Sequence, residues 1–432
     1  MIIGDYSSSV CGLKKLTLSL GRICSEPFNS GTELKNSVIS LFSGAGGLDL
    51  GVEAAGFQTR VCVEMDSASC LTLRANRDWS VLEQDIHNTS SRQILNSAGL
   101  RKGQASLLVG GPPCQPFSKS GFWHSGNTLR MEDPRASTLR EYLRVLRETL
   151  PQAFLLENVP GFIYEDKSEG LAYFLRQLKR LNKECRTNYS VSWSVLNAAE
   201  FGVPQRRQRL FMIGCKDGTA FQFPKPTHSQ TPGDLPLYRT AWDAIGDLEN
   251  SADLEEYKLS GRWARLLPSI PEGKNYLWHT KEGGGKPLFQ WRSRYWNFLL
   301  KLAKDAPSWT IQASPGPATG PFHWKNRRLT EHELRRLQTF PEDYQVLGER
   351  SSVQRQLGNA VPSALAELFG KEIRKQLFGE SVRQQLKLSP PVRESRPRAT
   401  RTQPLPATLA REILSSGKRV RNGFHPLSSA FK

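Results

Sequence analysis

A single cysteine in a stiff loop is the first residue with chemical potential. Residues 107–118 read LLVGGPPCQPFS, an apolar run followed by a glycine- and proline-rich loop that carries Cys114. Prolines fix φ and hold such a loop in one conformation, and a cysteine thiolate is strongly nucleophilic. Most cysteines are buried structural residues, which we expect of Cys62, Cys70 and Cys215. Because ligands bind at the carboxyl ends of parallel strands, we interpret Cys114 as a nucleophile.

A carboxylate and two arginines accompany the cysteine. Glu157 closes another apolar run, AFLLE, so we expect it at the same sheet edge as the nucleophile. Apolar neighbours raise the pKa of a carboxyl group, which can then carry a proton near neutral pH. Arg207 and Arg209 alternate in QRRQRL. A strand would therefore direct both to one face and Arg206 to the other.

A glycine-rich turn follows the first apolar run. Residues 42–47 read FSGAGG, and Glu64 lies 20 residues beyond Gly44. A carboxylate at this distance can bind ribose hydroxyls, as in dinucleotide folds. Asp49 stands where the third glycine of a GxGxxG pattern belongs, which disfavours a pyrophosphate ligand and an NAD-dependent oxidoreductase. A nucleoside without phosphates, such as S-adenosylmethionine, fits better, while the glycines alone fit an ordinary tight turn equally well.

Short apolar runs alternating with helical segments predict the elements that position these groups. Leucines recur at helical spacing between 137 and 150. Strands that alternate with helices indicate an α/β fold with a mostly parallel sheet. The expected strands are 38–42, 61–64, 107–110, 153–157, 190–196 and 209–213.

Composition narrows the class of protein. The chain has 432 residues and a formal net charge of +18, which suits a polyanionic partner. Seven scattered cysteines exclude a disulfide scaffold, and the lack of CxxC and HExxH motifs argues against a metal site. No apolar run approaches the ~18 residues of a membrane span, and we expect a cytoplasmic protein.

Changes in composition and in hydrophobic patterning divide the chain into five segments. Residues 1–36 predict a loose arm, and residues 37–225 the main α/β domain. Residues 226–325 are irregular, and residues 257–325 alone hold six of the ten tryptophans, most of which we expect to fill a small core. Helical order resumes over 326–379, with Thr330 and Glu333 as a capping box and a second helix after Pro362. Residues 380–432 carry eleven basic and three acidic residues, and we expect a disordered tail.

In combination and order, these motifs resemble the cytosine-C5 DNA methyltransferase family, of the bacterial, restriction-modification type. The resemblance covers about 38–225 and 327–375. Its blocks are FSGAGG, Glu64 with Asp66, Asp85, PPCQPFS, ENV, QRRQR, RLTEHELRRLQTFP and QLGNAVP.

The resemblance implies a class I S-adenosylmethionine-dependent methyltransferase fold, with residues 226–325 as a separate target-recognition domain. Cys114 would add to C6 of a flipped cytosine, Glu157 would bind or protonate N3, Arg209 would contact O2, and Arg207 would support a loop or a phosphate. The loop 119–135 would close over DNA. The implied cofactor residues are Phe42, Gly44, Gly46, Gly47, Leu48, Glu64, Met65, Asp85, Ile86, Pro112, Asn359 and Val361. The expected DNA contacts are Gln115, Ser118, Arg292 and Arg294.

Several alternatives stay open. Asp66 is as good a helix cap as a ligand contact. A related tRNA methyltransferase and a non-catalytic DNA-binding homologue are the competing functions; the length of 226–325 argues against the first and the intact Cys114 against the second. We expect a nucleoid-associated monomer, double-stranded DNA as partner, and a cognate restriction endonuclease. The basic tail is either a nonspecific DNA contact or a dispensable extension.

Overall fold

The central element is a seven-stranded sheet with strand order β3-β2-β1-β4-β5-β8-β6. The computed structural model describes residues 35–113, 137–163, 169–250, 255–290 and 295–418. The strands of the sheet are β1 (Ser37–Leu41), β2 (Gln58–Glu64), β3 (Ser80–Glu83), β4 (Leu107–Gly110), β5 (Ala153–Asn158), β6 (Ser192–Asn197) and β8 (Gln208–Cys215).

The sheet is parallel except at one strand. β1 pairs in parallel with β2 and β4, and the pairs β2–β3 and β4–β5 are also parallel. β8 lies antiparallel between β5 and β6. The predicted α/β class and mostly parallel sheet are therefore confirmed. Of the strands in this sheet, only β3 was not predicted, because it is an edge strand with no buried residue and hence no continuous apolar run.

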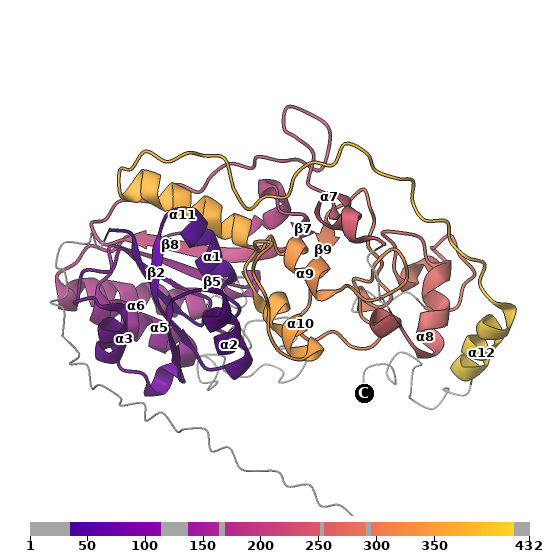
Figure 1. The fold of residues 1–432 in the computed structure, drawn as a ribbon, viewed down its shortest axis with the longest axis horizontal. Coiled ribbons are helices and arrows are strands. Elements are labelled where there is room, and N and C mark those ends of the chain that lie inside the picture. The colour runs from indigo at the N-terminus through magenta and orange to yellow at the C-terminus, as the bar shows by residue number, and fades with distance from the viewer. Residues whose placement is uncertain (1–34, 114–136, 164–168, 251–254, 291–294, 419–432) are drawn as a thin grey trace, which may run out of the picture. The chain divides into compact units, whose positions relative to one another are not determined.

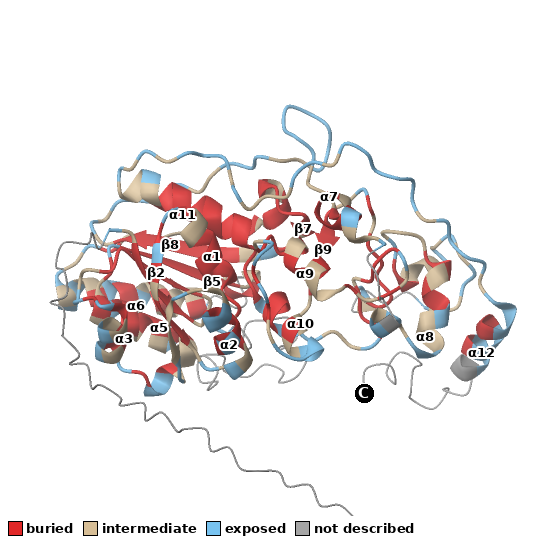
Figure 2. Cartoon of the chain, viewed as in Figure 1, coloured by how far each residue is buried: buried red, intermediate tan, exposed pale blue. Residues whose placement is uncertain are grey.

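Helices cover both faces of the sheet (Figure 1). Because side chains alternate along a strand, neighbours such as Leu108 and Val109 enter different cores. Leu108 packs with the layer formed by α3 (Ser91–Ala98), α5 (Ser137–Thr149) and α6 (Glu169–Cys185). Val109 packs with α1 (Gly47–Ala54) and α11 (Ser363–Leu377). Figure 2 shows α11 buried along much of its length.

The segment 226–325 has little regular structure. It contains α7 (Ala241–Ile245), α8 (Gly261–Leu266) and β9 (Ser308–Trp309), which pairs with β7 (Gln205–Arg206). Trp263 and Trp278 pack into its core around Phe298, as expected, and Trp324 is fully buried. Trp296 lies outside this core and is 43% exposed.

Two further helices return the chain to the sheet. α9 (Glu331–Leu337) begins with the predicted capping box, since the Thr330 side chain accepts from the Glu333 N–H and the Glu333 carboxylate accepts from the Thr330 N–H. α10 (Arg350–Asn359) carries Asn359 at its end, and α11 begins directly after Pro362 as predicted.

The prediction of a disordered tail is wrong for residues 380–418. This segment crosses from α11 to α12 (Ala407–Lys418), which lies at α8. Leu386 and Leu388 pack on the sheet core, and Leu409 and Ile413 are buried in the irregular region. The high charge and proline content of the segment favoured the prediction of disorder, although Leu409 and Ile413 stand four residues apart and therefore lie on one face of a helix. Residues 1–34 and 419–432 lie outside the described part of the chain.

The described residues hold neither a membrane helix nor a metal cluster. Over 35–418, apart from the gaps given above, no helix is long and apolar enough to cross a membrane. The same part of the chain holds no cluster of three or more His, Cys, Asp or Glu side chains that would suit a metal ion.

Candidate active site

A cavity of about 840 Å³ lies at the carboxyl edge of the parallel strands. β1, β2, β4 and β5 all end there, because parallel strands bring their carboxyl ends to one edge. The junction of α10 and α11 completes the wall. Of the residues expected to bind a cofactor, those that line the cavity are Phe42, Gly44, Gly47, Leu48, Glu64, Met65, Asp85, Ile86, Pro112, Asn359 and Val361.

The glycine-rich turn brings the backbone to this cavity. Phe42 and Gly44 have φ of 56° and 52°, in the left-handed region. Gly47 approaches the α10–α11 junction so closely that a Cβ atom there would lie 2.4 Å from the Val361 carbonyl oxygen. Gly46 differs from expectation, because it does not line the cavity. It has φ of 80° and is the N-cap of α1, so it shapes the turn.

Glu64 is fixed by the backbone around it. Its carboxylate accepts N–H groups from Gly44 at 2.8 Å and from Met65 and Asp66 at 2.9 Å. The Asp66 side chain caps α2 (Ser67–Asn76), which confirms one of the two alternatives, and Asp66 also lines the cavity. Asp66 also pairs with Arg355 of α10 at 2.6 Å, which links the two walls.

Asp85 is a second carboxylate of the cavity. It accepts from the His87 backbone N–H at 3.0 Å and lies 2.7 Å from the His87 Nδ1. These hydrogen bonds, the backbone one foremost, hold the pKa of Asp85 below its usual value. Asp85 therefore presents a charged acceptor beside the buried Ile86.

At the other end of the cavity, Glu157 and Arg209 form an ion pair. The Arg209 Nε lies 2.9 Å from the Glu157 Oε1, and both side chains are largely buried. Antiparallel pairing of β5 with β8 brings them together, since β8 starts at the edge where β5 ends. Burial raises the pKa of Glu157, while Arg209 and Arg207 oppose the rise.

Arg207 supports the backbone beneath this pair. It is 1% exposed and donates to the carbonyl oxygens of Gly358 at 2.9 Å and Ile311 at 3.4 Å. Both Arg207 and Arg209 line the cavity, whereas Arg206 turns away and lies 5.2 Å from the centre of the Trp309 ring. Arg207 is thus a positioning residue, and the loop it holds is the α10–α11 junction.

Comparison with known proteins agrees with this geometry. The family model of the C-5 cytosine-specific DNA methylases matches residues 36–375. The chain belongs to the C-5 cytosine-specific DNA methylase family.

Curated relatives and solved structures extend the comparison. The type II methyltransferase M.SacI of Streptomyces achromogenes is 41% identical and covers 79% of this chain and 93% of its own length. M1.HphI of Haemophilus parahaemolyticus is 35% identical, with 78% and 86% covered. The crystal structure of the Entamoeba histolytica methyltransferase EhMeth matches with a TM-score of 0.52 at 18% identity, over 78% of this chain and 98% of that one. That likeness shows the methyltransferase fold.

Some predicted site residues of this methylase fall outside the described residues. They are Cys114, Gln115, Ser118, Arg292 and Arg294, together with the loop 119–135. The chain is described up to Pro113, and residues 111–113 line the cavity beside Glu157. The Asn158 side chain donates to the Pro112 carbonyl oxygen at 3.3 Å, which fixes this end of the loop to β5.

Three residues that line the cavity were not predicted from the sequence, one on α1 and two on α10. Asp49 departs from the dinucleotide pattern in the sequence. In the structure it is fully buried in the cavity wall, and burial raises its pKa to about 7. Arg355 and Gln356 also line the cavity. Both residues lie on α10, where Arg355 precedes the QLGNAVP motif and Gln356 begins it. Their position next to Asn359 of that motif was the signal in the sequence that could have placed them at the cavity.

Proposed function

We propose that this chain is a DNA (cytosine-5-)-methyltransferase that flips one cytosine out of a short duplex site and transfers a methyl group from S-adenosylmethionine to C5. The observation that carries the proposal is the buried Glu157–Arg209 pair, next to residues 111–113, which lead directly to Cys114. Family membership and type II relatives support the same reaction.

The first step is the attack of the Cys114 thiolate on C6 of the cytosine. The new S–C6 bond moves electron density towards N3, O2 and C5. Glu157 donates a proton or a strong hydrogen bond to N3, and its raised pKa favours the protonated form that this needs. Arg209 donates to O2, and its pairing with Glu157 keeps the two groups aligned along one edge of the base.

The cavity suits S-adenosylmethionine as methyl donor. Its volume of about 840 Å³ fits a ligand of this size, and the fixed carboxylates Glu64 and Asp85 can accept from ribose hydroxyls and the adenine amine. The cofactor supplies an electrophilic methyl group. Phe42, Gly44 and Gly47, which line the cavity, would lie at the amino-acid end of the cofactor. Once C5 carries the methyl group, water takes the C5 proton, and the electron pair of the C5–H bond forms the C5=C6 double bond as the S–C6 bond breaks. The Cys114 thiolate leaves, and N3 returns its proton to Glu157, which restores the base and the enzyme.

We assign target recognition to residues 226–325 and, by likeness to the type II relatives, a restriction-modification setting with a cognate endonuclease. Base flipping costs a few kcal/mol of unstacking, which basic side chains of this region and of the loop 119–135 must offset.

Methylation in cells tests the proposal. The chain is expressed in a bacterial host without cytosine methylases, and total DNA is sequenced after bisulfite conversion. We expect protected cytosines at one short motif, and none with the Cys114→Ser variant. Unprotected DNA with a well-folded wild-type protein would contradict the proposal, and methylated tRNA in the same cells would establish the RNA alternative.

A further inference from the structure

The segment that was predicted to be disordered runs between two parts of the molecule. Residues 380–413, here called the strap, leave the end of α11 and reach α12 beside α8 (Figure 1). The match to the family model ends at residue 375, so the strap lies outside the part of the chain that matches the family. Its contacts fall into three groups.

The first anchor lies on α11. The Glu367 carboxylate is fully buried and accepts the backbone N–H groups of Lys387 at 2.8 Å and Leu388 at 3.0 Å. Lys371 neutralises this carboxylate at 2.7 Å, one turn further along the helix. A buried carboxylate with two N–H donors and a cation is well satisfied, so the helix holds the start of the strap firmly.

The second anchor lies on α7. The Arg393 backbone N–H donates to the Asp243 Oδ1 and its Nε to the Asp243 carbonyl oxygen, both at 3.0 Å. The Arg393 guanidinium also pairs with Asp247 at 2.5 Å. Asp247 binds Arg336 of α9 as well, at 2.6 Å. This carboxylate therefore joins the strap to the helices that lead back to the cavity.

The third anchor lies in the irregular region. The Thr400 N–H donates to the Glu272 Oε1 at 2.6 Å, and the Gln403 N–H donates to the Pro268 carbonyl oxygen at 3.0 Å. Beyond them, Leu409 and Ile413 of α12 are buried in the core of that region. The strap thus ends as part of the core that it reaches.

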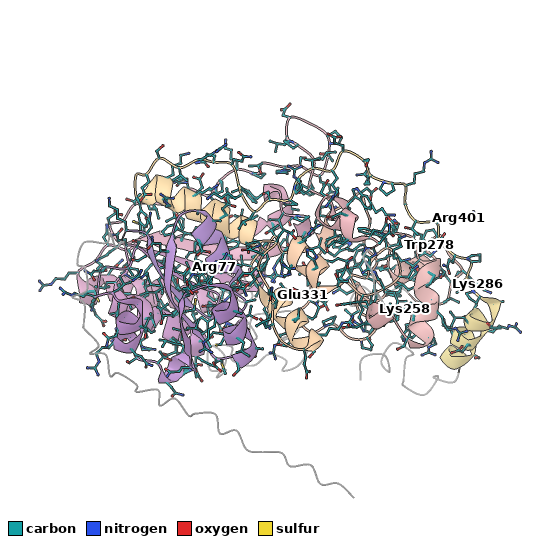
Figure 3. The ribbon with its side chains drawn as sticks, in the orientation of Figure 1. Arg77, Lys258, Trp278, Lys286, Glu331 and Arg401 are labelled. Carbon is teal, nitrogen blue, oxygen red and sulfur yellow. The ribbon has the colours of Figure 1, made fainter. Side chains whose placement is uncertain are left out.

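We propose that the strap holds the recognition region in register with the catalytic cavity, so that one duplex contacts both. The inference rests on the proposed function. Between the second and third anchors, the side chains of Arg396 and Arg398 are exposed, and Arg398 contacts Lys304 through its carbonyl oxygen. The side chain of Arg401, within the third anchor, is exposed as well (Figure 3). The recognition region is already joined to the catalytic segments at residues 225/226 and 325/326 and through the pairing of β7 with β9. The strap is a further link, which restricts the orientation of the region and so lowers the ordering cost of binding one duplex at both surfaces.

Cutting the strap in the folded protein tests this role. A protease site is inserted at residues 390–392, between the anchor on α11 and the anchor on α7, where Pro391 and Val392 are exposed, and the purified protein is cleaved. KM for a duplex carrying the motif found by bisulfite sequencing should rise by about threefold or more, because a loosened recognition region must be ordered again on binding. We expect kcat and the Kd of S-adenosylmethionine to change less than about twofold, because cleavage leaves the cavity itself intact. A flexible Gly-Ser insertion at the same place, without cleavage, should give an intermediate rise.

A matched variant separates tethering from direct DNA contact. Arg396→Gln, Arg398→Gln and Arg401→Gln are combined, which removes three charges and leaves the anchors intact. We expect an unchanged KM for DNA and an unchanged dependence of binding on salt. If cleavage leaves KM unchanged, or if the triple variant weakens binding and lowers the salt slope, the strap proposal is wrong. If the uncut protein itself fails to bind or methylate the duplex, the proposed function fails instead.

Discussion

At the scale of single residues, two buried carboxyl groups, Glu157 and Asp49, have raised pKa values. Glu157 was predicted as a strand-end carboxylate in apolar surroundings, and its burial follows from the AFLLE run. Its pairing with Arg209 needs the antiparallel register of β5 and β8, which neither strand encodes alone. Asp49 was not predicted to be buried, because burial of a helix residue depends on what packs over the helix.

Removal of the Glu157 proton should slow the reaction. The Glu157→Gln variant keeps a hydrogen bond to N3 but has no proton to transfer, so kcat should fall by roughly 10²- to 10⁴-fold. In the wild type, kcat/KM should rise with pH as the Cys114 thiol ionises and fall once Glu157 loses its proton above its raised pKa. The Gln variant should lack the falling limb. A wild-type profile of kcat/KM that climbs without a maximum would contradict the role of Glu157.

Asp49 should make the folded state sensitive to pH. Its pKa is about 7 in the folded protein against an ordinary value of 3.8, so the folded protein binds more protons between these values. Stability then decreases as pH rises from about 4 to about 7. At pH 8 the Asp49→Asn variant should be more stable than the wild type, by at most roughly 4 kcal/mol for a pKa change of this size. Urea unfolding at pH 5 and pH 8 gives the free energy of unfolding of both proteins. If that free energy depends on pH equally in the wild type and in the variant, the role of Asp49 is refuted.

At the scale of elements, close packing of α1 on α11 places the two halves of the cavity together. These helices come from opposite ends of the described chain, so sequence patterns predicted each helix but not their contact. At Gly51 of α1, a Cβ atom would lie 2.3 Å from the Ala366 Cβ and 2.4 Å from the Ser363 carbonyl oxygen. Only a glycine lets α11 come this near, and the cavity wall at Asn359 and Val361 depends on that approach.

The variant Gly51→Ala should force the two helices apart. Overpacking of this kind costs about 1–3 kcal/mol, and displacement of the α10–α11 junction should also weaken binding of S-adenosylmethionine. Gly233→Ala is the control, since a Cβ atom at Gly233 has no neighbour within 4 Å. Thermal unfolding and cofactor titration of both variants give the comparison. If Gly51→Ala and Gly233→Ala have the same melting temperature and the same affinity for S-adenosylmethionine, close packing at Gly51 is not needed for the cavity.

At the scale of the whole molecule, motif order predicted the fold class and the cavity, whereas composition failed for the strap. Motifs around a ligand site can be recognised in the sequence because they need particular residue types, such as Glu64 and the glycines of the turn at residues 42–47. The strap is held by backbone N–H groups and by a few leucines among charges and prolines, and those contacts have no residue-type signature. Its path could be found only from the packed structure.

Because the cavity joins segments from both ends of the chain, a ligand there should stabilise the whole fold. S-adenosylhomocysteine, at about a hundred times its Kd, should add about 2.7 kcal/mol to the free energy of unfolding by mass action. The melting temperature should therefore rise by several degrees. Glu64→Gln should reduce the rise, because the ribose hydroxyls lose a charged acceptor. No shift with a ligand that inhibits the enzyme would contradict this cavity as the cofactor site.

The most direct test of the central claim is covalent trapping on a duplex that carries 5-fluorocytosine in the target motif, with S-adenosylmethionine present. Fluorine at C5 blocks the last elimination, so the thioether between enzyme and base persists. We expect a denaturation-resistant protein–DNA adduct with the wild type and none with Cys114→Ser. No adduct with a wild-type protein that binds the duplex, or an adduct that survives the Cys114→Ser change, would contradict it.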